Sequence, residues 1–374
     1  MPLELAAFYR TTMPLDLGRL DALDDGRYHS LWLPDHLVSF WPDSIWTPEF
    51  TDLAEVSPSP HRYLDTVALA GAVAARTRRT RLATSVLDTA RRHPVLLAQS
   101  ALTLSHLADG RFILGLGAGE RENLAPYGFD HRHTVSRFAE AIRLIRLLWD
   151  SEGPVDFSGQ FFTLEHARLD TDLHRTGPPP IWIGANGPRM LQLVGEFGDG
   201  WWPTGSAGPA TYAAQLARIR EAAEQAGRDP DAITAAKMVV CLIGEPDELD
   251  EILQRPLVKS LVLQLTADAL AAAGHRHPMG EHWRGIQDID PRGLTRQRLL
   301  RLFDEVDPAA ILSVVPHGTP EQVAAQVADF GEAGAQVVSI LDYSGMAGQA
   351  YAAESARKVR EVEDELLQLT GSRP

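Results

Sequence analysis

Short apolar runs rich in β-branched residues alternate along the chain with longer segments in which apolar residues recur at helical spacing. The short runs predict β-strands at residues 3–9, 28–33, 80–86, 111–116, 180–184, 200–203, 235–243 and 336–341. The longer segments predict helices at residues 63–77, 94–107, 134–149, 188–197, 210–226 and 320–333. Thr319 and Pro320 supply an N-cap and a first helical position for the last of these. Eight strands that alternate with helices predict a closed parallel (β/α)8 TIM barrel.

Three stretches are longer than a simple connection between a strand and a helix. Residues 38–62 are rich in proline and tryptophan, and residues 153–165 alternate polar with apolar side chains, which predicts a β-hairpin. Residues 256–308 are expected to form helices over the barrel mouth, because long apolar loops in compact proteins are commonly lids. Since no linker or low-complexity segment separates these parts, we expect one domain over residues 1–374.

Composition narrows the class of partner. The formal net charge of −15 disfavours nucleic acid and anionic membranes, which are bound mainly through phosphate groups. No apolar run approaches the roughly 20 residues of a membrane span, and the N-terminus lacks the features of a signal peptide. Cys241 is the single cysteine, so no internal disulfide can form, and its apolar surroundings predict a buried structural thiol. We expect a cytoplasmic protein that acts on a small molecule.

Candidate catalytic residues follow the second and fourth predicted strands, where such barrels carry their active sites. Asp35 and His36 end the second strand, and an imidazole can donate a proton near neutral pH. The same pair would also suit a helix-capping aspartate beside a surface histidine. Gly117, Ala118 and Gly119 would let the backbone approach a planar or phosphorylated ligand closely. A dinucleotide fingerprint would need a further glycine where Glu120 stands, so a Rossmann site is disfavoured.

The fifth strand ends in a loop suited to a phosphate group. Gly184, Ala185, Asn186 and Gly187 place small residues and free N–H groups ahead of a helix. Ordinary turns between strands and helices also favour these residue types, so the loop alone does not decide the matter.

Histidine pairs raise the alternative of a metal-dependent barrel hydrolase. His131 with His133 and His275 with His277 have the H-x-H spacing of such enzymes. In those enzymes the pair follows the first strand, whereas here that strand ends in Tyr9-Arg10-Thr11. No H-E-x-x-H and no paired C-x-x-C occurs, so we expect no metal.

In their order and spacing these pieces resemble the luciferase-like monooxygenase family, and within it the coenzyme F420-dependent oxidoreductases. The resemblance spans nearly the whole chain and is carried by Asp35-His36, Thr84-Ser85-Val86, Gly117-Ala118-Gly119-Glu120 with Asn123, and Gly184-Ala185-Asn186-Gly187-Pro188. A closer likeness is to the phthiodiolone ketoreductases of mycobacteria. It is carried by residues 119–122 with 126–128, residues 187–191, and residues 277–280 with 287–289. The fold implied is a TIM barrel of the bacterial luciferase-like type, with insertions over its C-terminal mouth.

The resemblance also implies a cofactor, the deazaflavin coenzyme F420, and the residues that hold it. Asp35 would hydrogen-bond the polar edge of the ring, and a non-proline cis peptide between Ser85 and Val86 would back the ring. Asn123 would hold the ring or the tail. The glycine turn at Gly117, Ala118 and Gly119 would lie against the cofactor, and Gly184, Ala185, Asn186 and Gly187 would bind its phosphate.

The implied reaction is hydride transfer between the deazaflavin and a ketone or secondary alcohol. His36 would protonate the substrate oxygen, and Glu120 would act as a second acid/base or as an electrostatic stabiliser. Phe40, Trp41 and Trp46 would wall an apolar substrate pocket, which suits a bulky, lipid-like ketone. The three lysines do not form the set that holds a sugar phosphate in related enzymes. Family members usually pair through helices, which implies a homodimer.

Two further alternatives stay open. An FMN-dependent monooxygenase of the same family would bind a flavin that differs from the deazaflavin at one ring atom, so the sequence separates the two poorly. A non-catalytic flavin-binding protein is disfavoured, because binding alone needs neither His36 nor Glu120.

Overall fold

The structure, a computed structural model, describes residues 3–205 and 208–372. Eight parallel strands pair in a closed ring, each with two neighbours, as the sequence predicts. In barrel order they are β1 (Glu4–Phe8), β2 (Tyr28–Pro34), β3 (Arg81–Ser85), β5 (Phe112–Gly117), β8 (Ile181–Ile183), β9 (Gly200–Trp201), β10 (Thr234–Ile243) and β12 (Val337–Asp342). Two-residue strands β4 (Leu87–Asp88) and β11 (His317–Gly318) extend the edges of β5 and β10.

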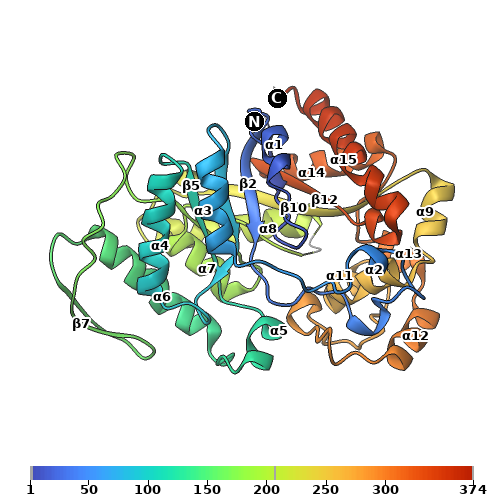
Figure 1. Ribbon diagram of the computed structural model, residues 1–374, viewed down its shortest axis with the longest axis horizontal. Coiled ribbons are helices and arrows are strands. Elements are labelled where there is room, and N and C mark those ends of the chain that lie inside the picture. Colours follow the sequence, from blue (N-terminus) through green and yellow to red (C-terminus); the bar gives the residue numbers. More distant parts are fainter. Residues whose placement is uncertain (1–2, 206–207, 373–374) are drawn as a thin grey trace.

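Helices surround the barrel on its outer side (Figure 1). The long ones are α3 (Thr66–Arg76), α4 (Pro94–Leu107), α6 (Thr134–Asp150), α7 (Pro188–Phe197), α8 (Pro209–Gln225), α14 (Pro320–Glu332) and α15 (Gln349–Thr370). Only short turns, among them α1 (Leu20–Leu23), connect β1 to β2. The capping box expected at Thr319 is present, since its side chain and that of Gln322 bond reciprocally to the backbone.

One helix begins later than its apolar periodicity predicts. The expected helix at residues 63–77 begins at Thr66, because the Asp65 side chain accepts a hydrogen bond from the N–H of Ala68 and so caps the first turn. Tyr63 is thereby left in the preceding loop, where it lines the cavity described below.

The two long insertions pack together beside the barrel mouth. Residues 38–62 contain α2 (Leu53–Val56), and the segment after β10 contains α9 (Pro246–Ile252), α10 (Pro256–Lys259), α11 (Ala267–Ala272), α12 (Arg296–Glu305) and α13 (Pro308–Leu312). Figure 1 shows α2 against these helices, and Phe40, Trp41 and Trp46 pack on their hydrophobic core. The prediction of helices in the second insertion is therefore confirmed.

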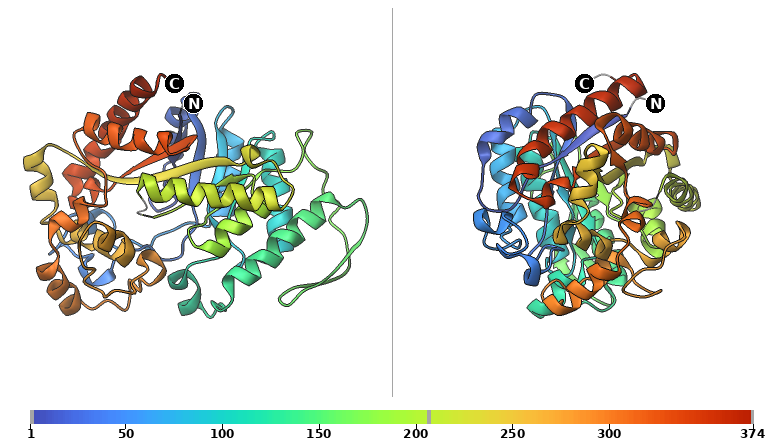
Figure 2. Two further views of the ribbon diagram at one scale, coloured as in Figure 1. Left: turned by 180° about the vertical axis from the view of Figure 1, so that it is seen from behind. Right: turned by 90° about the vertical axis from the view of Figure 1, so that its right-hand side faces the viewer.

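The predicted hairpin is present and ends somewhat later than expected. It consists of antiparallel strands β6 (Val155–Ser158) and β7 (Thr163–Ala167). Figures 1 and 2 place it at the end of the molecule remote from the insertion helices. Among the described residues, no helix combines the length and apolar character that crossing a membrane requires.

Three tryptophans fill the barrel beneath its mouth. Trp32 of β2 stacks on Trp202, which follows β9, with ring centroids 3.6 Å apart and an angle of 9° between the planes. Trp182 of β8 tilts against Trp32 at 5.4 Å. All three are buried, so the barrel interior is a packed core and any ligand must lie above it.

Candidate active site

A cavity of about 1400 Å³ opens at the C-terminal ends of the barrel strands, between the barrel and the insertions. Nearly all the predicted site residues line it: Asp35, His36, Phe40, Trp41, Trp46, Ser85, Val86, Gly117, Ala118, Gly119, Glu120, Asn123, Gly184, Asn186 and Gly187. Ala185 does not line it; it is buried, and its carbonyl accepts a 2.8 Å hydrogen bond from Nε1 of Trp201. The sequence thus placed its candidate residues around one cavity, Ala185 excepted, and the binding of a phosphate by this loop stays a prediction.

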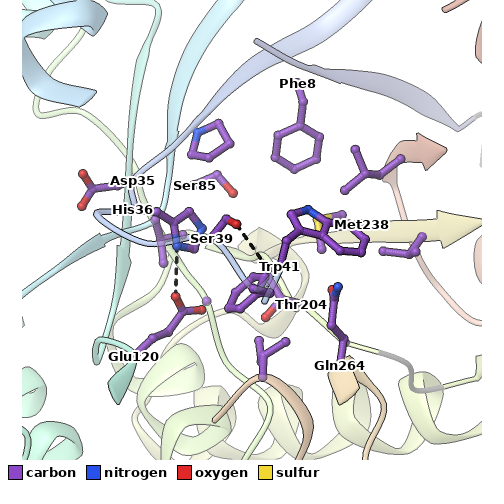
Figure 3. Close-up of a pocket in the computed structure, with 18 of the residues that line it drawn as sticks. Phe8, Asp35, His36, Ser39, Trp41, Ser85, Glu120, Thr204, Met238 and Gln264 are labelled. Atoms are coloured by element: carbon purple, nitrogen blue, oxygen red, sulfur yellow. Dashed lines mark hydrogen bonds and ion pairs between the residues drawn. The ribbon is translucent and has the colours of Figure 1, made fainter. Parts of the chain in front are cut away.

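His36 lies at the end of β2, half-buried between aromatic rings and a carboxylate. Its ring meets Phe40 edge-on at 5.2 Å and Tyr63 at 5.3 Å. Nδ1 of His36 lies 3.3 Å from Oε2 of Glu120 (Figure 3). Among the described residues Nε2 makes no hydrogen bond, so this nitrogen is the one available to a ligand.

The Asn123 side chain contacts both His36 and Glu120. Its Oδ1 accepts hydrogen bonds from the N–H groups of Leu37 at 2.6 Å and Val38 at 2.9 Å. Its Nδ2 lies 3.1 Å from Nδ1 of His36 and 3.3 Å from Oε2 of Glu120. The Asn123 side chain is buried and both ends of its amide bond within the protein, although the residue lines the cavity, so its predicted contact with the cofactor stays a prediction.

Glu122 is a member of the group that the sequence analysis did not single out. It lies on the single turn α5 (Arg121–Leu124), only 4% exposed, with Oε1 3.1 Å from Nδ2 of Asn123. Burial, and secondly the neighbouring Glu120, raise the pKa of Glu122 to about 10. In the sequence, the only sign of Glu122 is that it is a second carboxylate two residues after Glu120. The four-residue turn α5 is too short to show a periodicity that would predict which side chains face inward.

The same group is the only potential metal-ligand cluster in residues 3–205 and 208–372. Ligand atoms of His36, Glu120 and Glu122 lie within 4.8 Å of one another. Nδ2 of Asn123 lies within 3.3 Å of one acceptor atom of each of the three, and an amide N–H group is a donor that cannot ligate a cation. In the second H-x-H pair, His277 bonds the backbone through both ring nitrogens. These contacts disfavour the metal-dependent hydrolase.

Asp35 is held by two arginines that the sequence analysis missed. Its carboxylate accepts hydrogen bonds from Arg91 and, at 2.7 and 3.0 Å, from Arg92, and Arg91 also pairs with Asp88. Figure 3 shows the Asp35 carboxylate turned away from the centre of the pocket. Asp35 therefore fixes the end of β2 from which His36 projects.

The floor of the cavity is formed at the end of β3. The peptide bond between Ser85 and Val86 is cis, as the resemblance implied. Oγ of Ser85 accepts a 3.1 Å hydrogen bond from Nε1 of Trp202, which ties the floor to the tryptophan stack. A Cβ atom at Gly117 would lie 2.7 Å from Val86 Cγ2, so glycine is required for this close approach.

The loop after β8 presents an uncapped helix start to the cavity. Gly187 is the N-cap of α7, Pro188 occupies its first turn, and no side chain caps the helix. Gly187 to Met190 line the cavity, and the Arg189 guanidinium donates a 3.1 Å hydrogen bond to Ser136 Oγ. An unfilled helix N-terminus favours an anion.

The opposite wall is aromatic and apolar. Trp41 tilts against Tyr343 at 5.2 Å, and Nε1 of Trp46 donates to the Ser57 carbonyl at 2.7 Å. Figure 3 shows Trp41, Met238 and Gln264 facing His36 and Glu120 across the pocket. The cavity therefore has one side with an imidazole and a carboxylate and another that is largely apolar.

Comparison with known proteins is consistent with this geometry. The model of the luciferase-like monooxygenase family matches residues 20–336. The chain belongs to the luciferase-like monooxygenase family.

Among the relatives of this family member is a phthiodiolone/phenolphthiodiolone dimycocerosates ketoreductase of Mycobacterium sp. (strain JLS). It is 38% identical over 308 residues, which cover 81% of each chain.

Two solved structures share the fold at low sequence identity. An F420-dependent secondary alcohol dehydrogenase in complex with an F420-acetone adduct matches with a TM-score of 0.70 and 20% identity, over 97% of this chain and 99% of that one. The coenzyme F420 dependent tetrahydromethanopterin reductase from Methanopyrus kandleri matches with a TM-score of 0.72 and 18% identity, over 99% and 100%. At these identities the likeness establishes the barrel of this luciferase-like protein.

Proposed function

We propose that the protein is a coenzyme F420-dependent oxidoreductase that transfers a hydride between the deazaflavin and a ketone or secondary alcohol. The observation that carries the proposal is His36, whose Nδ1 is engaged by Asn123 and Glu120 while the ring borders a large cavity. The name of the mycobacterial relative, a ketoreductase, supports the reaction class, and the F420-dependent structural neighbours support the cofactor.

The residues present fit such a cofactor. The uncapped start of α7 at Gly187 offers free N–H groups to a phosphate, and a Cβ at Gly187 would meet nothing within 4 Å, so the backbone is open to a ligand there. Gly117, Gly119 and Val86 give a floor that a flat ring system can approach. Gly184, Asn186 and Gly187 would hold the phosphate. When bound, the reduced deazaflavin supplies the hydride.

The side chains around His36 supply the proton. Asn123 and Glu120 engage Nδ1, which leaves Nε2 to donate to a substrate oxygen as negative charge develops on it. Asp35, clamped by Arg91 and Arg92, holds the strand end that aims His36. Glu120, with a side chain 30% exposed, lies beside Nδ1 and is the group with which this nitrogen can exchange a proton.

The apolar wall favours a bulky, lipid-like substrate. Phe40, Trp41 and Trp46 join the cavity to the hydrophobic core of the insertion, which excludes water from the proton-transfer side. A homodimer remains part of the proposal, and size-exclusion chromatography with light scattering would test it.

The deciding experiment titrates the purified protein with F420 and with FMN under anaerobic conditions, followed by fluorescence. We expect tighter binding of F420, and oxidation of the reduced cofactor when a long-chain methyl ketone is added. Preferred binding of FMN together with oxygen consumption would instead establish a monooxygenase.

A further inference from the structure

The carboxyl groups of Glu120 and Glu122 lie too close together to be ionised independently. One oxygen of each lies within 4.8 Å of the other and of a ring nitrogen of His36. Glu122 is buried, and its Oε2 has no hydrogen-bond partner among the described residues. A second negative charge there would be both unpaired and desolvated.

A count of hydrogen atoms leads to the same conclusion. The two backbone donors at Leu37 and Val38 fix the orientation of the Asn123 amide, so its NH₂ group must face the cluster. That group has two hydrogens, yet three acceptors lie within 3.3 Å of it, on His36, Glu120 and Glu122. The third acceptor needs a further proton, carried either on Nδ1 of His36 or on a carboxyl group, and the buried, unpartnered Oε2 of Glu122 favours the carboxyl group.

We propose that Glu120 and Glu122 hold one proton between them and deliver it to Nδ1 of His36 as Nε2 of His36 protonates the substrate. This inference rests on the proposed ketone reduction. It assigns Glu122 as a proton-storing and positioning residue, which touches the catalytic residues and not the substrate.

Ketone reduction needs one hydride and one proton. The hydride from the reduced cofactor forms the new C–H bond, and the electron pair of the C=O π bond moves to oxygen. That oxygen takes the proton from Nε2 of His36, while Nδ1 takes the shared proton from Glu120, 3.3 Å away. The ring stays neutral throughout, and the carboxyl pair is left with two negative charges.

The pair is then reprotonated from solvent. A proton enters at Nε2 from the cavity, and the proton on Nδ1 returns to the carboxyl pair, so each cycle takes up one proton. His36 lies beside Glu120, and Tyr63 is close enough for Glu120 to act on it: burial, with Tyr343 and Glu120, raises the pKa of Tyr63. Tyr63 therefore adds no negative charge at neutral pH.

The Glu122→Gln variant isolates the stored proton. Glutamine matches the shape of a protonated glutamic acid, and the cluster keeps the same net charge at neutral pH, but the side chain has no proton to release. Glu332→Gln, at the exposed end of α14, is the matched control.

The experiment has two readouts. Infrared spectroscopy of the protein without cofactor should show a protonated carboxyl group at pH 8 that disappears in E122Q and persists in E332Q. In single-turnover ketone reduction, E122Q should be slower by about tenfold or more, with unchanged F420 affinity and melting temperature. E332Q should match the wild type in both.

Each other outcome is decisive. Absence of the protonated carboxyl in the wild type, or a wild-type rate in E122Q, would overturn the proton store. If the infrared signal behaves as expected but the wild type neither binds F420 nor reduces a ketone, the proposed function fails and with it the delivery step, while the shared proton stands.

Discussion

The amide nitrogen of Asn123 lies 3.1 Å from Nδ1 of His36, and its carbonyl oxygen accepts from two backbone N–H groups in the residues that follow His36. One side chain therefore fixes both the loop that carries the imidazole and the nitrogen that the imidazole presents to the cavity. Because Nδ1 is engaged, Nε2 is left for substrate.

Replacement of His36 should remove the proton donor and leave the cavity in place. We expect H36A to lower turnover by about 10²–10⁴-fold, with little change in F420 affinity. Steady-state kinetics and a fluorescence titration measure the two effects. His282→Ala, an exposed histidine in the insertion, serves as control and should be neutral. An unchanged rate in H36A would reject the role of His36.

Asn123→Asp tests the donor end of the Asn123 amide while it keeps the acceptor end. The aspartate keeps an acceptor for the N–H groups of Leu37 and Val38 but replaces the donor with an oxygen beside Glu120 and Glu122. We expect a loss in kcat of about tenfold or more, since like charges now crowd His36. N123A should in addition lose about 1–3 kcal/mol of stability, because buried N–H groups are left unpaired. Thermal melts beside kinetics distinguish the variants, and a fully active N123D would contradict this account.

The start of α7 can be tested without disturbing the fold. A Cβ at Gly187 meets no protein atom within 4 Å, so G187A should melt like the wild type. The added methyl group enters the space assigned to the phosphate, and we expect F420 to bind about tenfold more weakly or worse. Gly153→Ala, equally open but on the hairpin side, is the control. Equal affinities of G187A and G153A would place the phosphate elsewhere.

The aromatic wall should set the preference for substrate length. Truncation of Trp41, which packs against Tyr343, removes apolar surface from the cavity. Along a series of methyl ketones, W41A should lose kcat/KM progressively with chain length, by about tenfold for the longest, and least for acetone. A uniform loss across the series would mean that Trp41 supports the fold and not the substrate.

Buried Lys237 predicts a pH-dependent stability. Burial lowers its pKa to about 8, and Nζ donates to the Gly205 carbonyl at 2.8 Å. Between pH 8 and the pKa of an unfolded lysine, the unfolded chain binds more protons, so this residue makes stability rise with pH across that window. Below pH 8 the charged, buried Lys237 lowers the free energy of unfolding by the full amount, about 3 kcal/mol.

Lys237→Met should therefore raise the melting temperature at pH 7. Loss of the hydrogen bond to Gly205 reduces this gain, and the gain should shrink as the pH approaches 10. Lys259→Met, in the insertion helix α10, is the comparison. A gain that does not depend on pH would show that Lys237 is not desolvated.

The fold could be predicted from the sequence because most barrel strands are short apolar runs, separated by segments whose apolar residues recur at helical spacing. The eight predicted strands all pair in the barrel. The predicted start of α3 was wrong. The apolar spacing continues back to Tyr63, but the Asp65 side chain caps the helix, which begins at Thr66.

The site could be predicted only where it follows strand ends. His36, Glu120 and Gly187 come within four residues of the ends of β2, β5 and β8, so topology brings them to one cavity. The place of Glu122 depends on which way a short turn faces, and the place of Arg91 depends on which carboxylate its long side chain reaches. Neither property produces a periodic pattern in the sequence. The tryptophan stack likewise joins residues from β2, β8 and the end of β9 that only the closed barrel brings together.

The most direct test of hydride transfer uses F420 reduced with deuterium and a methyl ketone, with the alcohol analysed by mass spectrometry. The account predicts one deuterium on the carbinol carbon, transferred by the wild type and only at a trace rate by H36A. An unlabelled alcohol, or a product that forms only in the presence of oxygen, would contradict it.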